Sequence, residues 1–435
     1  MSKMDGLLLS KVFVVSLQAV GFFLLPCSAG LTTGQQPLKN NAAPAMAPFD
    51  TEMETFMQAR KIPGGALAVV KDCRLVYVRG YGWADRENHV AVSPLSLFRI
   101  ASLSKPITAV AVLRLMEEGR LDLDDRVFEI LQFLADLAPG KKPDSRLKNI
   151  TIRHLLNHTG GWDSRKGFDP MSRSTAIAKS LGIPCPPGPQ AIIRYMIGQP
   201  LDFDPGSRYA YSNFGYCLLG RVIENVTGMS YESYEKQHVL APIGITGMRI
   251  GASLKSKKAE GEVCYYTADN KTTRSVFPEW SGQVPIQYGG FCLEAMDAHG
   301  GWVASVVDLA RFTAALDNRE RSPLLRPETF NLMYARPEAP VWRNADGSPT
   351  DSYYACGWMV RPVGKDGKAN YWHAGSLPGS YALLVRRWDG ISWVALFNQR
   401  SGDPKLPDGA IDAALHRAAN GVSRWPTENL FHNSR

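Results

Sequence analysis

The distribution of strand-like and helix-like segments constrains the fold of this chain more than any other feature of its sequence. Runs rich in β-branched, aromatic and other apolar residues occur in two groups, one near each end of the chain. They cover residues 66–70, 75–78, 354–363, 371–374, 381–387 and 391–398. Segments with helical periodicity fill most of the chain in between. We therefore expect an α+β fold, in which strands from both ends share one antiparallel sheet beside a helical region.

The composition is that of an ordinary globular protein. Of 435 residues, 45% are hydrophobic and 21% are charged, and the formal net charge is +8. No stripe of basic residues alternates with aromatic ones, and no nucleic-acid motif is present, so we predict no nucleic-acid partner.

The first 29 residues resemble an export signal. Lys3 and Lys11 precede or open a mostly apolar run, 12–25, and small residues up to Ala29 offer a cleavage site. We expect a signal peptide (1–29), a flexible linker (30–48), a catalytic domain (49–420) and a C-terminal tail (421–435). The protein would be exported, periplasmic or secreted, with no membrane span after signal removal. A lipid anchor at Cys27 is disfavoured by the preceding Pro26, and an uncleaved anchor is a further alternative.

Cysteine spacing predicts neither a metal site nor a particular disulfide pattern. Six of the seven cysteines would remain after signal removal, and no pair has metal-ligand spacing with histidine. We predict no metal and no cofactor, and the pairing of the cysteines stays open.

A serine and a lysine lie at the start of a predicted helix in the segment 98–119. Pro106 fits a first helical turn because no backbone N–H is needed there, and Gly119 is a natural end. Since positions i and i+3 share a helix face, Lys105 should place its amine beside the hydroxyl of Ser102. The helix N-terminus favours negative charge at the same point, so Ser102 is a candidate nucleophile.

The pattern Ser-x-x-Lys is weak by itself, because it also occurs at Ser145 and Ser233. Ser145 lies in a polar run that opens no apolar helix, and Ser233 lies in a polar helical segment typical of a solvated face. We interpret both as surface positions whose replacement by alanine leaves activity near that of the wild type.

A second motif is Tyr211-Ser-Asn213, before another predicted helix. A phenol is a poor base at its usual pKa near 10. Neighbouring cations would favour its anion, which would then accept a proton from a serine. The structural alternative is a tyrosine that caps the following helix while Asn213 bonds to the backbone of the turn.

A third motif is His373-Ala-Gly375, on a strand-like run. A glycine there would let a substrate approach the strand closely, and His373 would supply a cation or donor for the phenol or for an anionic substrate group. The pattern His-x-Gly also occurs at His158 and His299. We interpret both as turn residues, and we expect His158→Ala to leave the rate near wild type.

The order of these three motifs resembles that of the serine β-lactamase and D,D-peptidase superfamily. The likeness is strongest to its class C β-lactamase-like group, which includes D-alanyl-D-alanine carboxypeptidases, D-aminopeptidases and serine-type (family VIII) carboxylesterases. Supporting phrases occur at 98–101, 152–156, 205–206 and 300–301. The resemblance covers roughly residues 49–398. It implies a β-lactamase/transpeptidase-like fold, an antiparallel sheet flanked by helices with a mainly helical subdomain.

The resemblance also implies roles for individual residues. Ser102 would be the acylated nucleophile, Lys105 its activating partner and Tyr211 the general base or acid. The backbone N–H groups of Ser102 and Ser376 would form the oxyanion hole. Asn213 would contact the acyl side of the substrate, and the strand that carries His373 and Gly375 would line the site.

One departure bears on the substrate. Many β-lactamases have Lys-Thr-Gly where this chain has His373-Ala-Gly375, and a histidine near neutral pH holds a substrate carboxylate less well than a lysine. We therefore expect an esterase-like hydrolase of small esters or D-amino-acyl amides. The alternatives are a D-alanyl-D-alanine carboxypeptidase, a weak class C-type β-lactamase, or a catalytically idle homologue that acts in binding or assembly. The sequence leaves open the oligomeric state and whether residues 160–190 form a lid.

Overall fold

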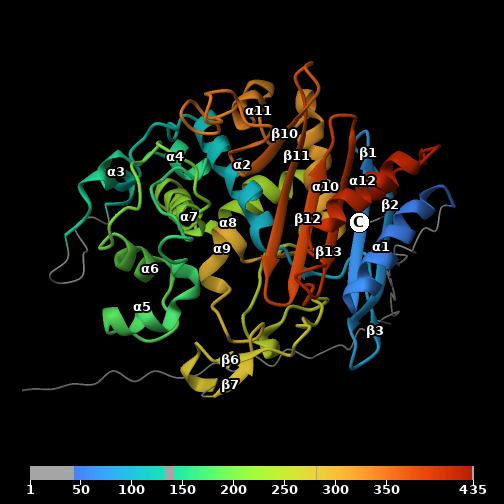
Figure 1. Ribbon diagram of the computed structural model, residues 1–435, viewed down its shortest axis with the longest axis horizontal. Helices are drawn as coiled ribbons and strands as arrows, with labels where there is room; N and C mark the ends of the chain where they lie inside the picture. Colours follow the sequence, from blue (N-terminus) through green and yellow to red (C-terminus); the bar gives the residue numbers. More distant parts are fainter. Residues whose placement is uncertain (1–43, 133–141, 281, 434–435) are drawn as a thin grey trace, which may run out of the picture. The chain divides into compact units, whose positions relative to one another are not determined.

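In the structure, a computed structural model that describes residues 44–132, 142–280 and 282–433, strands from both ends of the chain form one eight-stranded sheet (Figure 1). The strand order is β3–β2–β1–β13–β12–β11–β10–β9, and neighbouring strands are antiparallel. The strands are β1 (Gly64–Lys71), β2 (Arg74–Asp85), β3 (Val90–Ala91), β9 (Tyr353–Ala355), β10 (Trp358–Val363), β11 (Lys368–Leu377), β12 (Ser380–Arg386) and β13 (Ile391–Phe397). The predicted shared sheet is thus confirmed, with β1 beside β13.

The strand boundaries differ from the prediction in two places. β2 continues to Asp85, well beyond the predicted end at residue 78. The predicted strand 354–363 is two strands, because Cys356 (φ 36°) and Gly357 (φ 89°) turn the chain between β9 and β10. Two consecutive left-handed residues reverse the backbone, and periodicity alone does not show such a turn.

The sheet separates two hydrophobic cores, because successive side chains of a strand point to opposite faces. In β1, Leu67 and Val69 belong to the core beneath α1 (Ala47–Arg60) and α12 (Ala410–Gly421). Ala66 and Ala68 belong to the core on the other face, which α10 (Val306–Asp317) covers. Figure 1 shows α1 and α12 in front of the sheet and α10 behind it.

A helical region lies beside the β11 side of the sheet, as predicted (Figure 1). Its buried axis is α2 (Ser104–Glu117), which contacts α7 (Asn213–Thr227) and α9 (Asp297–Gly300). The predicted end of α2 is confirmed, because Gly119 has a φ of 69° and the Arg120 N–H donates to Leu115 O at 3.0 Å. The remaining α-helices are α3 (Val127–Leu131), α4 (Ile152–Leu156), α5 (Ser174–Leu181), α6 (Pro189–Met196), α8 (Tyr231–Tyr234) and α11 (Pro327–Met333).

The segment 160–190, which we expected to be irregular, contains α5 and the start of α6. Ile177, Ile192 and Ile193 are buried in the larger core, so apolar residues at helical spacing fold this segment onto α7 despite its many Gly, Pro and Ser residues.

Short strands outside the eight-stranded sheet form two smaller sheets. β4 (Phe98–Arg99), β8 (Trp302–Ala304) and β5 (Arg249–Ile250) form a three-stranded sheet, and β6 (Thr272–Arg274) pairs with β7 (Gln283–Pro285).

In the described ranges no helix is both long and apolar enough to cross a bilayer. The six cysteines there have free thiols. The predicted signal peptide and most of the predicted linker lie outside these ranges.

Candidate active site

Ser102 lies in a tight turn between β4 and α2. The backbone entering this turn is held in place, because the Ile100 N–H donates to Trp302 O at 3.0 Å. Ser102 is the middle residue of a 3-10 turn that begins at Ala101, whose φ of 48° is rare for a residue other than glycine. Ala101 and Leu103 are buried, whereas Ser102 is partly exposed, so the turn presents its side chain to solvent.

The amine of Lys105 is completely buried in the first turn of α2 and contacts three oxygen atoms. Nζ lies 3.0 Å from Oγ of Ser102, 2.8 Å from Oδ1 of Asn213 and 2.9 Å from the backbone oxygen of His299. The structure thus brings the amine and the hydroxyl together, as their spacing in the sequence predicted.

The surroundings of Lys105 determine where its protons lie. Burial lowers the pKa of Lys105 well below its ordinary value, and the opposing effect of Asp169 is smaller. In its neutral form the amine has two N–H donors and one lone pair. The oxygens of Asn213 and His299 only accept hydrogen bonds, so they take the two N–H groups. The lone pair is then left for the hydroxyl of Ser102.

Asp169 fixes the orientation of the Asn213 amide. Nδ2 of Asn213 lies 2.5 Å from Oδ2 of Asp169, and because a carboxylate accepts, the amide must turn its NH₂ there and its Oδ1 toward Lys105. Sequence reasoning missed Asp169. Its only local signal is that of a turn cap, in which Oδ1 accepts from the Met171 N–H at 3.0 Å.

The ring of Tyr211 lies over the amine of Lys105, with Nζ 4.7 Å from the ring centroid. Burial raises the pKa of the Tyr211 phenol above its ordinary value, although a hydrogen bond with Ser102 acts in the opposite direction. We expected neighbouring cations to favour the phenolate. The structure differs, because burial also lowers the pKa values of Lys105 and of the adjacent His158. The phenol therefore stays protonated.

His158, which we interpreted as a turn residue, lies directly behind Tyr211. The two ring centroids are 4.3 Å apart, and Nδ1 of His158 accepts from the Ser212 N–H at 3.2 Å. Ser212 also caps α7, so His158 supports the whole Tyr211-Ser-Asn213 motif. His299, which we also interpreted as a turn residue, lies in α9 and contributes its backbone oxygen to Lys105. No local pattern in the sequence indicates either contact.

Strand β11 passes very close to Ser102 at Gly375. A Cβ atom on Gly375 would lie 2.1 Å from the backbone oxygen of Ile100 and 3.1 Å from the backbone nitrogen of Ser102. Position 375 therefore requires glycine for close packing. The group that approaches Gly375 closely is the protein backbone at Ile100, and not a substrate as we expected. The next residue, Ser376, is exposed at the same edge.

His373 does not offer the cation or free donor that we expected. Its side chain is 4% exposed, its Nδ1 lies 2.8 Å from Ala374 O, and its Nε2 lies 3.1 Å from the hydroxyl of Tyr354. Nδ1 donates to the carbonyl and Nε2 accepts from the phenol, so both ring nitrogens are occupied. Burial, helped by Lys105, lowers the pKa of His373 to about 3. The imidazole of His373 is therefore neutral and is packed inside the protein.

The other two Ser-x-x-Lys serines lie in solvent, away from this cluster. Ser145 is exposed in a short 3-10 helix. Ser233 is exposed on α8, where its hydroxyl accepts from that of Ser230 at 2.7 Å. Neither contacts an amine in the manner of Ser102.

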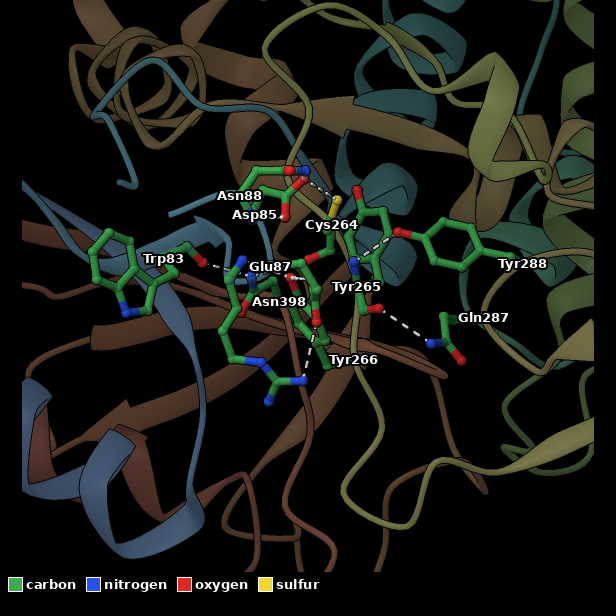
Figure 2. Close-up of polar contacts among 11 residues, drawn as sticks. Trp83, Asp85, Glu87, Asn88, Cys264, Tyr265, Tyr266, Gln287, Tyr288 and Asn398 are labelled. Atoms are coloured by element: carbon green, nitrogen blue, oxygen red, sulfur yellow. Dashed lines mark hydrogen bonds and ion pairs between the residues drawn. The ribbon is translucent and has the colours of Figure 1, made fainter. Parts of the chain in front are cut away.

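A polar network joins the loop after residue 263 to the sheet (Figure 2). Nδ2 of Asn398 donates to the backbone oxygens of Trp83 and Cys264, both at 3.0 Å, and so ties the loop after residue 263 to β2 and β13. A Cβ atom on Gly379, in the turn between β11 and β12, would lie only 2.8 Å from Cβ of Tyr265. The loop therefore packs tightly against the turn that follows Ser376.

Comparison with known proteins identifies relatives over most of the chain. The family model "Beta-lactamase" matches residues 49–418. Penicillin-binding protein 4* of Bacillus subtilis is 27% identical over 374 residues, which cover 85% of this chain and 75% of that protein. Protein flp of Staphylococcus aureus is 33% identical over 195 residues, which cover 45% of this chain and only 36% of that protein.

Solved structures share the fold. The octameric penicillin-binding protein homologue from Pyrococcus abyssi has a TM-score of 0.62 and 25% identity, and the match covers 85% of this chain and 77% of that one. The D-amino acid amidase from Ochrobactrum anthropi has a TM-score of 0.65 and 21% identity, with 87% of this chain and 99% of that one covered. These likenesses confirm the predicted β-lactamase/transpeptidase-like fold.

Proposed function

Because the chain belongs to the Beta-lactamase family, whose members are serine hydrolases, we propose that it hydrolyses small esters or amides through an acyl-enzyme on Ser102. The observation that carries the proposal is the contact set of the buried Lys105 amine. In the neutral form of this amine its two N–H groups are taken by Asn213 and His299, which leaves one lone pair for the hydroxyl of Ser102. A hydroxyl beside such a base is an activated nucleophile.

In the acylation step, Nζ of Lys105 takes the proton of Ser102 while Oγ bonds to the carbonyl carbon of the substrate. The carbonyl electron pair moves onto oxygen and forms a tetrahedral oxyanion. When the carbonyl re-forms, the bond to the alkoxide or amine leaving group breaks, and that group receives the proton held by Lys105. The phenol of Tyr211 is protonated, bonds to Ser102 and carries its ring over the amine of Lys105, so it relays this proton. A water molecule then hydrolyses the acyl-enzyme by the same transfers in reverse.

The oxyanion would be held by the backbone N–H groups of Ser102 and Ser376. The close passage of β11 over the backbone nitrogen of Ser102, which Gly375 permits, supports this assignment. In other hydrolases the loss of one such donor typically lowers the rate by roughly 10²–10³-fold.

A small ester or a D-amino-acyl amide is the substrate that we propose. The neutral state of His373 supports this choice over substrates that need a cation for a carboxylate. The likeness to Penicillin-binding protein 4* over 85% of the chain favours a second candidate, a D-alanyl-D-alanine carboxypeptidase or weak β-lactamase. A catalytically idle homologue is the third. We also propose that residues 1–29 direct export.

Covalent labelling with a fluorophosphonate, followed by mass spectrometry, tests the proposal. Wild-type protein should gain one adduct on Ser102, Ser102→Ala should gain none, and Ser145→Ala should label like wild type. Parallel assays with p-nitrophenyl acetate, D-alanine p-nitroanilide, a D-Ala-D-Ala peptide and nitrocefin separate the substrate candidates. A wild-type protein that neither labels nor turns over any of these substrates is idle, and adducts on another residue would disprove the assignment of Ser102.

A further inference from the structure

Asp169 places a carboxylate without a counter-ion beside the proposed acyl site. Its Oδ2 accepts from Nδ2 of Asn213 and its Oδ1 from the Met171 N–H. Asp169 is partly exposed, and within the ranges that the structure describes no lysine, arginine or histidine forms an ion pair with it. Arg173, in the same segment, instead lies over the ring of Phe168, 5.3 Å from its centroid.

Among the described residues of the site, the histidines supply no compensating positive charge. Burial lowers the pKa values of His158, His299 and His373, so these imidazoles are neutral near pH 7, and it also lowers the pKa of Lys105 well below its ordinary value. Asp169 is therefore the side chain that sets the charge at this end of the site.

The carboxylate also has unused hydrogen-bonding capacity. Two oxygens offer about four acceptor sites, and the protein uses two of them. An ammonium group next to the acyl carbonyl of a substrate would reach the same region as the Asn213 amide, because Asn213 joins Asp169 to Lys105.

On the basis of the proposed function, we propose that Asp169 binds the protonated α-amino group of the substrate. The enzyme would thus select aminoacyl esters and amides with a free amine over N-acylated or uncharged acyl groups. Asp169 would be a specificity-determining residue, in addition to its role in orienting Asn213.

A substrate pair separates these two roles of Asp169. D-Alanine p-nitroanilide and N-acetyl-D-alanine p-nitroanilide share the leaving group and differ in the charge of the amine. A defect in the orientation of Asn213 lowers kcat/KM for both, whereas loss of an ammonium contact lowers it for the free amine only. The ratio of the two kcat/KM values therefore reports the contact alone.

We expect wild type to prefer the free amine, and Asp169→Asn to lower that preference roughly 10- to 100-fold, the range for a hydrogen bond to a charged group. Asp204→Asn, which removes an exposed carboxylate paired with Arg146, is the matched control and should leave the ratio unchanged. The preference of the wild type should also decline above about pH 8, where an α-amino group loses its proton.

The outcomes are distinct. Equal losses for both substrates in Asp169→Asn would assign Asp169 to orientation only and overturn the proposal. A wild type that prefers the N-acetyl substrate, or whose preference does not change with pH, would also overturn it, even where the variant fails to fold. A wild type that neither turns over these substrates nor labels at Ser102 contradicts the proposed function itself.

Discussion

Replacing Lys105 with methionine tests whether its amine is uncharged in the folded protein. Methionine has a similar length and no titrating group. In the unfolded chain the amine has its ordinary pKa near 10.4, whereas burial lowers the folded-state pKa well below that value. Between these two pKa values the unfolded state holds a proton that the folded state lacks, so folding of the wild type releases one proton from Lys105.

The sign and size of the effect follow from this proton. Because the unfolded state binds it, the free energy of unfolding rises with pH, by about 1.4 kcal/mol per pH unit inside the window. Below the folded-state pKa of Lys105 the destabilisation is constant and largest, and above pH 10.4 it vanishes. Lys105→Met lacks this contribution. From pH 7 to pH 9 the wild type should therefore gain up to about 2.7 kcal/mol relative to the variant.

Urea unfolding followed by tryptophan fluorescence at pH 7, 8 and 9 measures both proteins. Lys148→Met, which changes an exposed lysine, is the matched control and should follow the pH dependence of the wild type. Parallel pH dependences of wild type and Lys105→Met would mean that the folded amine stays charged. In that case it has no lone pair for Ser102, and the proposed acylation step is refuted.

Three further changes test other parts of the site. Tyr211→Phe removes the proton relay and should lower kcat roughly 10²–10⁴-fold. Stopped-flow acylation with a p-nitrophenyl ester measures the loss of rate, and a near-normal rate would remove Tyr211 from the mechanism. Gly375→Ala places a Cβ atom 2.1 Å from Ile100 O and should abolish fluorophosphonate labelling by displacing β11. Gly188→Ala, where the nearest atom lies 4.0 Å away, should label normally, and equal labelling of both variants would contradict the close packing. His158→Ala opens a cavity behind Tyr211 and should lower both thermal stability and kcat. The sequence alone had predicted a rate near wild type, and a wild-type rate would support that earlier prediction instead.

The sheet and its helical neighbour could be predicted because they depend on local patterns. Nearly continuous apolar runs in 66–70 and 391–398 define strands that bury both faces, and such strands must pair. The turn at Cys356 and Gly357 could not be found in this way, because an apolar run continues through it and only backbone dihedrals reveal it. The helix α5 was hidden by the Gly, Pro and Ser residues around it, whereas the helical spacing of 191–197 predicted α6.

The sequence predicted those parts of the candidate site that lie within a single helix turn or a single short motif. Ser102 and Lys105 are three residues apart, so helical geometry alone brings them together. Asp169 and His158 reach the same place by tertiary folding, and no periodicity in the sequence relates them to Asn213 or Tyr211. Burial also keeps Tyr211 and His373 uncharged, where we expected an anion and a cation. A motif shows which groups can ionise but not how much water surrounds them.

These charges bear on which substrates the site accepts. A lysine at the position of His373 would give the strand edge a permanent cation, whereas the buried His373 has a pKa of about 3 and both of its nitrogens bonded within the protein. A substrate carboxylate would thus find no positive partner here, and near Asn213 it would meet the carboxylate of Asp169. Like charges brought close together at such a partly exposed site repel each other. We therefore expect a substrate carboxylate, such as the C-terminus of a D-Ala-D-Ala peptide or the ring carboxylate of nitrocefin, to be disfavoured relative to the uncharged ester or amide end of an amino-acyl substrate.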